Sequence, residues 1–197
     1  MIFNYTLLST WLNCPYQAAR RFIIKDLPYE KTAAMEEGAR VHKAIEERIR
    51  RKVPLPTDLR LHEPLIGCLD QVHCRPETKL GVTHSGRATD FFAADVWLRG
   101  VLDAPFNLRT DTAILLDWKT GKPREDEFEL AIGALLLQAH DPILSRIYGQ
   151  YVWLKEGRRG KLHNCSDTTR TCAGKTGGHN ERSPMVDFRA DGGGGGA

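Results

Sequence analysis

Two strand-like segments that each end in an acidic residue most constrain what this chain can form. Residues 99–103 end in Asp103, and the apolar run 113–116 is followed by Asp117, Trp118 and Lys119. Because side chains alternate between the two faces of a strand, Asp117 and Lys119 point the same way. Carboxylates bind Mg²⁺, and an ammonium beside them acts on an attacking water or a phosphate. The pattern therefore predicts metal-dependent phosphodiester chemistry.

Size and composition are consistent with one domain in a reducing compartment. The chain has 197 residues, of which 41% are hydrophobic, and a formal net charge of +3. A chain of this size can bury a core of its own. No apolar stretch reaches the length of a membrane span, and residues 1–6 lack a basic region followed by a long apolar core, so we expect a cytoplasmic protein of a bacterial or phage-infected cell without a membrane partner. The five scattered cysteines are expected to be free thiols.

Periodicity predicts a mixed α/β order. We expect helices at about residues 9–23 (capped by Ser9 or Thr10), 32–51, 65–72 and 126–139. We expect strands at about 78–83, 95–106, 113–118, 149–154 and 161–163. This order predicts an α/β fold in residues 1–163, with N-terminal helices and a mixed central β-sheet flanked by helices.

The C-terminal segment differs from the rest of the chain. Residues 164–197 have no apolar periodicity and end in Asp191, five glycines and Ala197. Such a composition cannot bury enough apolar surface to order itself, so we expect a disordered tail. A domain that closes on strand 149–154 usually adds another packing helix, so the tail also indicates a truncation or frame change.

A third motif joins the two strand ends. Gly38 and His42 lie four residues apart on the predicted helix 32–51, upstream of both acidic strand ends. Segments 37–42, 99–103 and 116–122 together resemble the RecB-type branch of the PD-(D/E)XK nuclease superfamily. The opening residues 8–16 resemble the first helix of the same branch. The resemblance covers roughly residues 5–160 and implies a restriction-endonuclease-like core.

The resemblance implies a role for each motif residue. Asp103 and Asp117 would ligate Mg²⁺ or Mn²⁺, with the Trp118 carbonyl and His42 completing the ligand set. Lys119 would orient or deprotonate the attacking water. The implied protein is a divalent-metal-dependent DNA nuclease, an exonuclease of recombination, repair or phage DNA processing that leaves 5′-phosphate and 3′-hydroxyl ends. A homo-oligomer or a helicase partner is consistent with the same family.

Two positions depart from the family pattern. After the Asp-x-Lys segment the branch carries a helix with Gln-x-x-x-Tyr, and here Glu129 and Gly133 occupy those two places. Glu129 either adds a catalytic acid or repels phosphate. Gly133 removes a stacking group. These departures keep two alternatives open, a nuclease-fold protein that binds DNA or a partner without cutting it, and a structure-selective endonuclease.

Several of these residues also have a simpler, purely structural explanation. His42 lies on an apolar helix face, where a core histidine is the default, and Asp103 precedes a turn-like Ala-Pro pair. Glu77 is either an additional acid near the site or a solvated start of a strand.

Other residues are candidates for contacts with nucleic acid or for ligands of an iron–sulfur cluster. Arg20, Arg21 and Lys122 are candidates for contacts with phosphate, although a solvated helix face explains the two arginines equally well. Cys14 with Cys165 and Cys172 supplies three thiolates where a [4Fe–4S] cluster requires four, so the pattern disfavours such a cluster.

Overall fold

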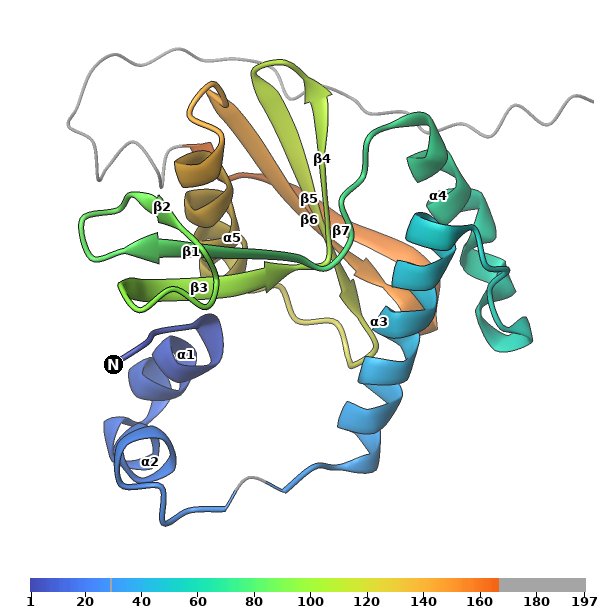
Figure 1. The fold of residues 1–197 in the computed structure, drawn as a ribbon. Coiled ribbons are helices and arrows are strands. Elements are labelled where there is room, and N and C mark those ends of the chain that lie inside the picture. The colour runs from blue at the N-terminus through green and yellow to red at the C-terminus, as the bar shows by residue number, and fades with distance from the viewer. Residues whose placement is uncertain (29, 167–197) are drawn as a thin grey trace, which may run out of the picture.

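A computed structural model describes residues 1–28 and 30–166 of the chain. The described part has a mixed α/β fold with two β-sheets and several helices (Figure 1). Most of the predicted tail, residues 167–197, lies outside the described residues. Cys172, one of the three cysteines considered as ligands of a [4Fe–4S] cluster, lies there too. Cys165 is described and buried, and Cys14 is half-buried.

The chain begins with a short helical arm. It consists of α1 (Tyr5–Asn13), α2 (Pro15–Ala18) and a π-helical turn (Ala19–Ile24). The predicted start at Ser9 or Thr10 is wrong, because the Asn4 side chain caps the helix by accepting from Leu7 N–H at 2.9 Å. The hydroxyls of Ser9 and Thr10 instead bond back to the carbonyl of Thr6 inside the helix. The helix stops at Asn13 because Pro15 cannot continue its hydrogen-bond pattern.

The long helix α3 (Ala33–Arg51) forms as its sequence predicts. The Thr32 hydroxyl accepts from Met35 N–H at 3.3 Å and caps the first turn. Its buried stripe, Val41, Ile45 and Ile49, repeats every four residues, which is the spacing of one helix face. Lys52 ends the helix in the left-handed conformation, with φ 58°.

Helical turns and a small antiparallel sheet follow α3. The predicted third helix is longer and less regular than expected: a 3₁₀ turn (Thr57–His62), α4 (Glu63–Cys68) and a second 3₁₀ turn (Leu69–Gln71). The first sheet has the order β2-β1-β3 and consists of β1 (Thr78–Thr83), β2 (Ala88–Thr89) and β3 (Val96–Leu102).

The second sheet has the order β4-β5-β6-β7. Its strands are β4 (Ala104–Arg109), β5 (Thr112–Lys119), β6 (Arg146–Trp153) and β7 (Arg158–Asn164), with a 3₁₀ turn (Leu154–Glu156) between the last two. The β5–β6 pair is parallel and is connected by α5 (Glu127–His140), while the other two pairs are antiparallel. This sheet is therefore mixed.

The prediction of one central sheet is wrong in one respect. The predicted strand 95–106 is divided at Asp103, where the backbone bends. Before the bend, β3 pairs with β1, and after it β4 pairs with β5. The two sheets therefore diverge at Asp103. Sequence periodicity could not show this division, because it records which face a side chain occupies and not which strand the backbone pairs with.

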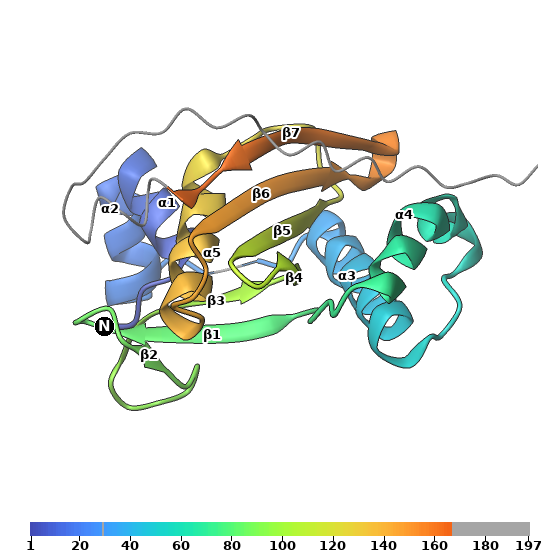
Figure 2. The same ribbon diagram turned by 90° about the horizontal axis from the view of Figure 1, so that it is seen from above.

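Helices cover the larger sheet on both sides (Figure 2). One core packs α5 against Leu115 of β5 and Tyr151 of β6, and it extends to β1 and β3. The other packs α3 and α4 against the alternate residues of β5, including Leu116 and Trp118. The strand alternation thus sends successive residues of β5 into two separate cores. Asp117 and Lys119 at the end of β5 lie on the same face as Leu115, toward α5.

Close packing joins α5 to β6 at a glycine. A Cβ added to Gly149 would lie 3.0 Å from three side-chain atoms of Leu130. The Asp126 side chain caps α5 by accepting from Phe128 N–H at 3.0 Å. Glycine at this position therefore lets the helix that carries Glu129 lie directly on the sheet.

Among the described residues, no helix is both long and apolar enough to cross a membrane.

Candidate active site

The candidate site lies where the two sheets diverge. Asp103 is at the bend between β3 and β4, and its Oδ2 accepts the backbone N–H of Trp118 at 2.8 Å. This hydrogen bond ties the end of β5 to the bend. It brings the two acidic segments found in the sequence to the same place, although fourteen positions of chain and a hairpin separate Asp103 from Asp117.

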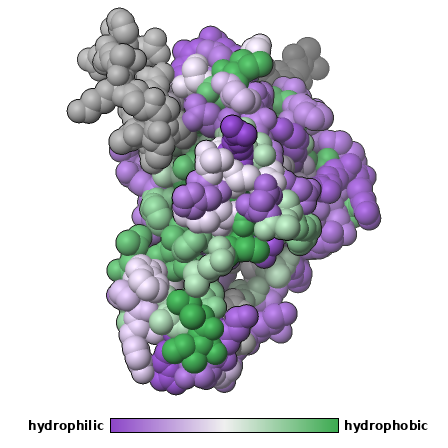
Figure 3. All heavy atoms as spheres, turned by 60° about the vertical axis from the view of Figure 1, so that its left-hand side comes forward, coloured by the Kyte–Doolittle hydropathy of each residue, from purple (hydrophilic) through white to green (hydrophobic). Residues whose placement is uncertain are grey.

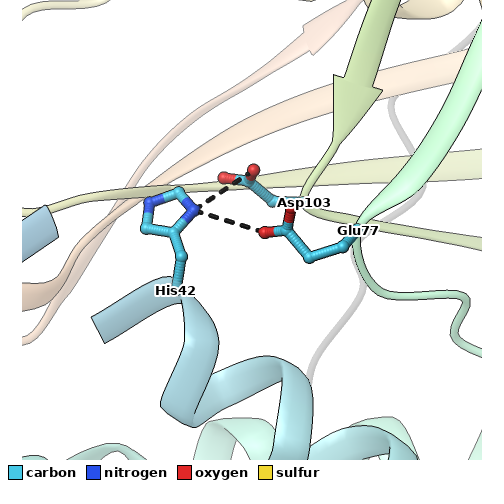
Figure 4. A group of neighbouring side chains, drawn as sticks. All are labelled: His42, Glu77 and Asp103. Atoms are coloured by element: carbon cyan, nitrogen blue, oxygen red, sulfur yellow. Dashed lines mark ion pairs between the residues drawn. The ribbon is translucent and has the colours of Figure 1, made fainter. Parts of the chain in front are cut away.

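His42, Glu77 and Asp103 form a convergent cluster (Figure 4). The Nδ1 atom of His42 lies 3.4 Å from Asp103 Oδ1 and 3.5 Å from Glu77 Oε1. One donor atom from each residue lies within 4.8 Å of the others. The three come from α3, from the residue just before β1, and from the bend after β3, so the tertiary fold alone assembles them.

Glu77 is held by an unusual backbone conformation. Its φ is 51°, in the left-handed region that residues other than glycine rarely adopt. The backbone N–H of Glu77 donates to the Asp103 carbonyl at 2.9 Å, which helps to hold this conformation. Such a conformation costs on the order of 1 kcal/mol and persists where its surroundings determine it. The consequence here is that a second carboxylate faces His42.

The orientation of the His42 ring is set from its other side. Nε2 lies 2.9 Å from the Trp118 carbonyl, an acceptor, so Nε2 carries a proton and donates it. Nδ1 is left to face the two carboxylates. Burial lowers the pKa of His42, but the hydrogen bonds to Asp103 and Glu77 raise it by more, to about 10. A positive charge between the two carboxylates is therefore strongly favoured, whether a proton or a cation supplies it.

The cluster has the donors and spacing that a divalent cation accepts. Ligands at about 2.1 Å in an octahedral shell lie about 3 Å apart. The measured separations of 3.4 and 3.5 Å from His42 Nδ1 are close to that spacing. All three side chains are half-buried, so they retain access to solvent. The residues thus fit a cation with one imidazole nitrogen and two carboxylate groups.

A second group of charged residues adjoins this cluster. Lys119 Nζ lies 2.8 Å from Asp117 Oδ1 and 2.9 Å from Glu129 Oε2. Burial raises the pKa of Asp117 well above its ordinary value, and the negative charge of Asp103 adds to the effect, while Lys119 opposes it. Burial lowers the pKa of Lys119, but its two carboxylate partners raise it by more, so Lys119 is a cation. The predicted same-face arrangement of Asp117 and Lys119 is confirmed by their ion pair.

Tyrosine residues that the sequence did not single out support this second group. The Tyr151 hydroxyl lies 3.0 Å from Glu129 Oε2 and 2.7 Å from the Asp126 carbonyl, and Lys119 Nζ lies 5.2 Å from the centre of the Tyr151 ring. The Tyr5 hydroxyl donates to Asp126 Oδ2 at 2.7 Å. Burial and the charge of Glu129 raise the pKa of Tyr151, so its hydroxyl stays protonated. No local pattern distinguishes Tyr151 from a core tyrosine of β6.

A pocket of about 340 Å³ opens onto both groups. Asp103, Asp117 and Glu129 contribute to its lining, together with the start of α1 and residues 99–102 of β3. Gly133 also lines it, and a Cβ there would lie 3.1 Å from Leu102 and 3.3 Å from Leu115. Asp103 of the cluster and the two carboxylates that hold Lys119 are therefore accessible from one hollow of the surface, whereas His42 and Glu77 line a separate groove beside α3.

The structure distributes the predicted metal ligands differently from the expectation. Asp103 and His42 belong to the convergent cluster, and Glu77, only a weak candidate from the sequence, belongs to it as well. Asp117 contributes no atom to that cluster and pairs instead with Lys119. The Trp118 carbonyl accepts from His42, so in this structure it orients the histidine.

The residues predicted to contact phosphate belong to neither of the two charged groups of the candidate site. Arg20 and Arg21 lie on the π-helical turn, where Arg20 forms a 2.9 Å ion pair with Asp26, and Lys122 is exposed in the connection between β5 and α5. Exposed apolar side chains gather over the N-terminal helices in the lower half of Figure 3. They include Leu12, Ile23 and Ile24. The N-terminal helices therefore expose apolar side chains beside the two half-buried arginines.

No protein-family model matches the chain, and no curated protein matches it.

Proposed function

We propose that this protein is a divalent-metal-dependent nuclease that hydrolyses phosphodiester bonds in DNA. The observation that carries the proposal is the cluster of His42 Nδ1, Glu77 and Asp103, with donor atoms within 4.8 Å of one another. The half-buried Asp117–Lys119 ion pair adjoins it. The sequence resemblance to the RecB-type branch of the PD-(D/E)XK nucleases, with its restriction-endonuclease-like core, supports the same chemistry.

Different residues have different roles in the proposed enzyme. In the proposed enzyme, His42, Glu77 and Asp103 would hold Mg²⁺ or Mn²⁺, and the negative charge of Asp103 adds to the burial that raises the pKa of the neighbouring Asp117. A bound divalent ion supplies electrostatic stabilisation of the phosphoryl oxygens and makes a water molecule more acidic. Trp118 keeps the His42 ring turned so that Nδ1 faces the carboxylates. The backbone thus fixes a ligand that would otherwise rotate.

Lys119 supplies the positive charge next to the reacting phosphate. Its ammonium is held by Asp117 and Glu129, and in the proposed reaction it stabilises negative charge that develops on the phosphoryl group. Glu129 occupies the place at which the family has glutamine, and it accepts a hydrogen bond from Lys119 as a glutamine oxygen would. Its role in this proposal is to position Lys119.

The experiment is a metal-dependent cleavage assay on the purified full chain. End-labelled linear DNA, in single- and double-stranded form, is incubated with Mg²⁺ or Mn²⁺ beside closed circular DNA. We expect degradation of linear DNA that is lost in Asp117→Ala and Lys119→Ala and retained in the control Glu156→Ala, an exposed residue of the turn before β7. Undiminished cleavage in both site variants would overturn the proposal. Closed circles separate an exonuclease, which spares them, from an endonuclease.

One observation favours a second candidate, a nuclease-fold protein that binds without cutting. Lys119 is engaged by two carboxylates, and no side chain extends from Gly133. Calorimetric titration with Mn²⁺ separates the candidates. Tight binding that Asp103→Ala abolishes supports the nuclease, whereas a protein that neither binds Mn²⁺ nor cleaves supports the scaffold.

A further inference from the structure

We propose that Phe91, Phe92, Lys79 and Arg99 form a stacking platform for an unpaired nucleic-acid strand, which it directs toward the carboxylates of the candidate site. The purpose of the platform rests on the proposed nuclease function, although the binding itself does not require cleavage. We call these four residues the aromatic–basic platform.

The register of β1 and β3 places the two cations on the face that leads to Asp103. Lys79 pairs with Val101, and Gly81 pairs with Arg99, and paired residues of neighbouring strands share a face. The opposite face carries the residues that are buried against α5, namely Leu80, Val82 and Leu98. Along β3 the alternation places Arg99 and Val101 on one face, and Asp103 follows at the bend after Leu102. At about 3.3 Å per residue, Arg99 and Asp103 lie about 13 Å apart along the chain.

The connection between β2 and β3 folds two phenylalanine rings over these cations. Arg99 lies 4.7 Å from the centre of the Phe91 ring, and Lys79 lies 5.6 Å from the centre of the Phe92 ring. The two rings contact edge to face, with centres 4.9 Å apart. Cations over ring faces are attracted by the negative π-surface, so these contacts hold the platform together.

The exposed ring is held in place without being covered. Phe92 is 71% exposed, which is exceptional for a phenyl side chain. Its backbone N–H donates to Asp90 Oδ1 at 2.8 Å, and the Arg99 guanidinium donates to the Phe91 carbonyl at 3.3 Å. A ring already held by a cation–π contact and an edge-to-face contact loses less conformational entropy than a free ring when a flat ligand stacks on it. The geometry thus favours a flat ligand that stacks on Phe92 over a ligand whose binding would require the connection between β2 and β3 to change shape.

Two residues of the platform and part of the candidate site line one hollow. Phe91 and Arg99 line the same 340 Å³ pocket as Asp103, Asp117 and Glu129. A strand whose base stacks on the platform can therefore place its backbone along Arg99 and Val101 toward the carboxylates. The two cations face the phosphates, and this complementarity is what identifies the occupant as a nucleic acid.

The occupant is an unpaired strand and not a duplex. Aromatic platforms bind single strands because every base presents a π-face, whereas in a duplex the base faces are covered by their neighbours. Two cations are also few for a duplex, which is bound mainly through many phosphate contacts. Duplex DNA and a protein partner remain as outcomes of the test.

The test measures binding by the full chain in the presence of EDTA, so that no cleavage occurs. Fluorescence anisotropy compares a labelled oligothymidine with a duplex of the same length at one salt concentration. We expect Phe92→Ala to weaken oligothymidine binding at least about fivefold, the lower end of the effect of losing one stacked base, with duplex binding changed less than about twofold. Phe92→Trp, which preserves a stacking surface, should restore binding. Lys79→Gln should reduce the dependence of binding on salt.

The matched control is Ile143→Ala, which removes a comparably exposed apolar side chain from the connection after α5. The proposal is overturned if Phe92→Ala binds oligothymidine as tightly as the unaltered protein, or if it weakens duplex binding to the same extent. Platform-dependent binding by a protein that never cleaves DNA would leave this inference standing and refute the proposed nuclease function. Cleavage of single strands at an unchanged rate and affinity in Phe92→Ala would refute this inference and leave the proposed nuclease function standing.

Discussion

The hydroxyl of Tyr151 lies 3.0 Å from the carboxylate of Glu129, and the same tyrosine places its ring beneath the ammonium of Lys119. Tyr151 is completely buried on β6, while Glu129 lies in the first turn of α5. This contact links the parallel strand pair to the helix that crosses between its strands. The position of Lys119 therefore depends on a residue that would not touch a substrate.

Replacing Tyr151 with phenylalanine should weaken this arrangement without leaving a large cavity. The variant keeps the ring but leaves Glu129 and the Asp126 carbonyl with one donor fewer, so the free energy of unfolding should fall by about 1–2 kcal/mol. Urea denaturation measures the change. Tyr148→Phe, a buried tyrosine on the same strand, serves as the control and should change stability by less than about 0.5 kcal/mol. Equal losses in both variants would contradict the special role of Tyr151.

Glu77 distinguishes the structural cluster from the set expected from sequence. Glu77→Gln keeps the shape of the side chain but removes its charge, so Mn²⁺ affinity should fall at least about tenfold, as measured by calorimetry. The control is Glu46→Gln, which alters another acid beside the same groove of α3 but outside the cluster. If both variants bind Mn²⁺ as the unaltered protein does, Glu77 is not a ligand.

Gly149→Ala tests the close packing of α5 on β6. The added methyl group would lie 3.0 Å from three atoms of Leu130, including its Cβ, which cannot rotate away. We expect a loss of about 1–3 kcal/mol in the free energy of unfolding, because the helix must move from the sheet. In Gly121→Ala the new methyl group meets no atom within 4 Å, and stability should change by less than about 0.5 kcal/mol. Thermal or urea unfolding of the pair decides the matter.

His62 should make stability depend on pH. Burial lowers its pKa below the ordinary value of about 6.5, against a smaller opposing effect of a hydrogen bond with the backbone of Leu154. The unfolded chain then binds the proton more readily than the folded one. The contribution of His62 to the free energy of unfolding is therefore complete above pH 6.5, and it is lost as the pH falls from there through the lower pKa of the folded state.

The unfolding free energy should fall between pH 7 and pH 5 by at most about 1.4 kcal/mol per pH unit from this residue. Urea titrations at several pH values measure the slope. His62→Gln should flatten it, while His73→Gln, at an exposed position, should leave it unchanged. An unaltered slope in His62→Gln would refute the assignment.

Local periodicity accounts for the elements that formed as expected. The four-residue spacing of Val41, Ile45 and Ile49 defines one face of α3, and the two-residue alternation of β5 predicts that Asp117 and Lys119 meet. Each of these is a property of a short segment. They could be predicted because side-chain direction follows from the local backbone alone.

The division of strand 95–106 could not be predicted in the same way. The apolar pattern continues through Asp103, but the backbone partners change from β1 to β5. Pairing is a choice among distant segments, and its energy depends on which of them the chain brings together. The start of the first helix was missed for a smaller reason, since Asn4 is as good a cap as Ser9 or Thr10.

The sequence by itself determined which carboxylates and which lysine stand at the ends of strands, because alternation and capping act over a few residues. The tertiary structure alone decided that Glu77 joins His42 and Asp103, and that Asp117 contributes no atom to that cluster. The first outcome depends on a left-handed backbone conformation at Glu77, whose N–H donates to the Asp103 carbonyl, and Asp103 is tied to β5 by the hydrogen bond from Trp118. Both hydrogen bonds join segments far apart in the chain, whose geometry no local pattern encodes.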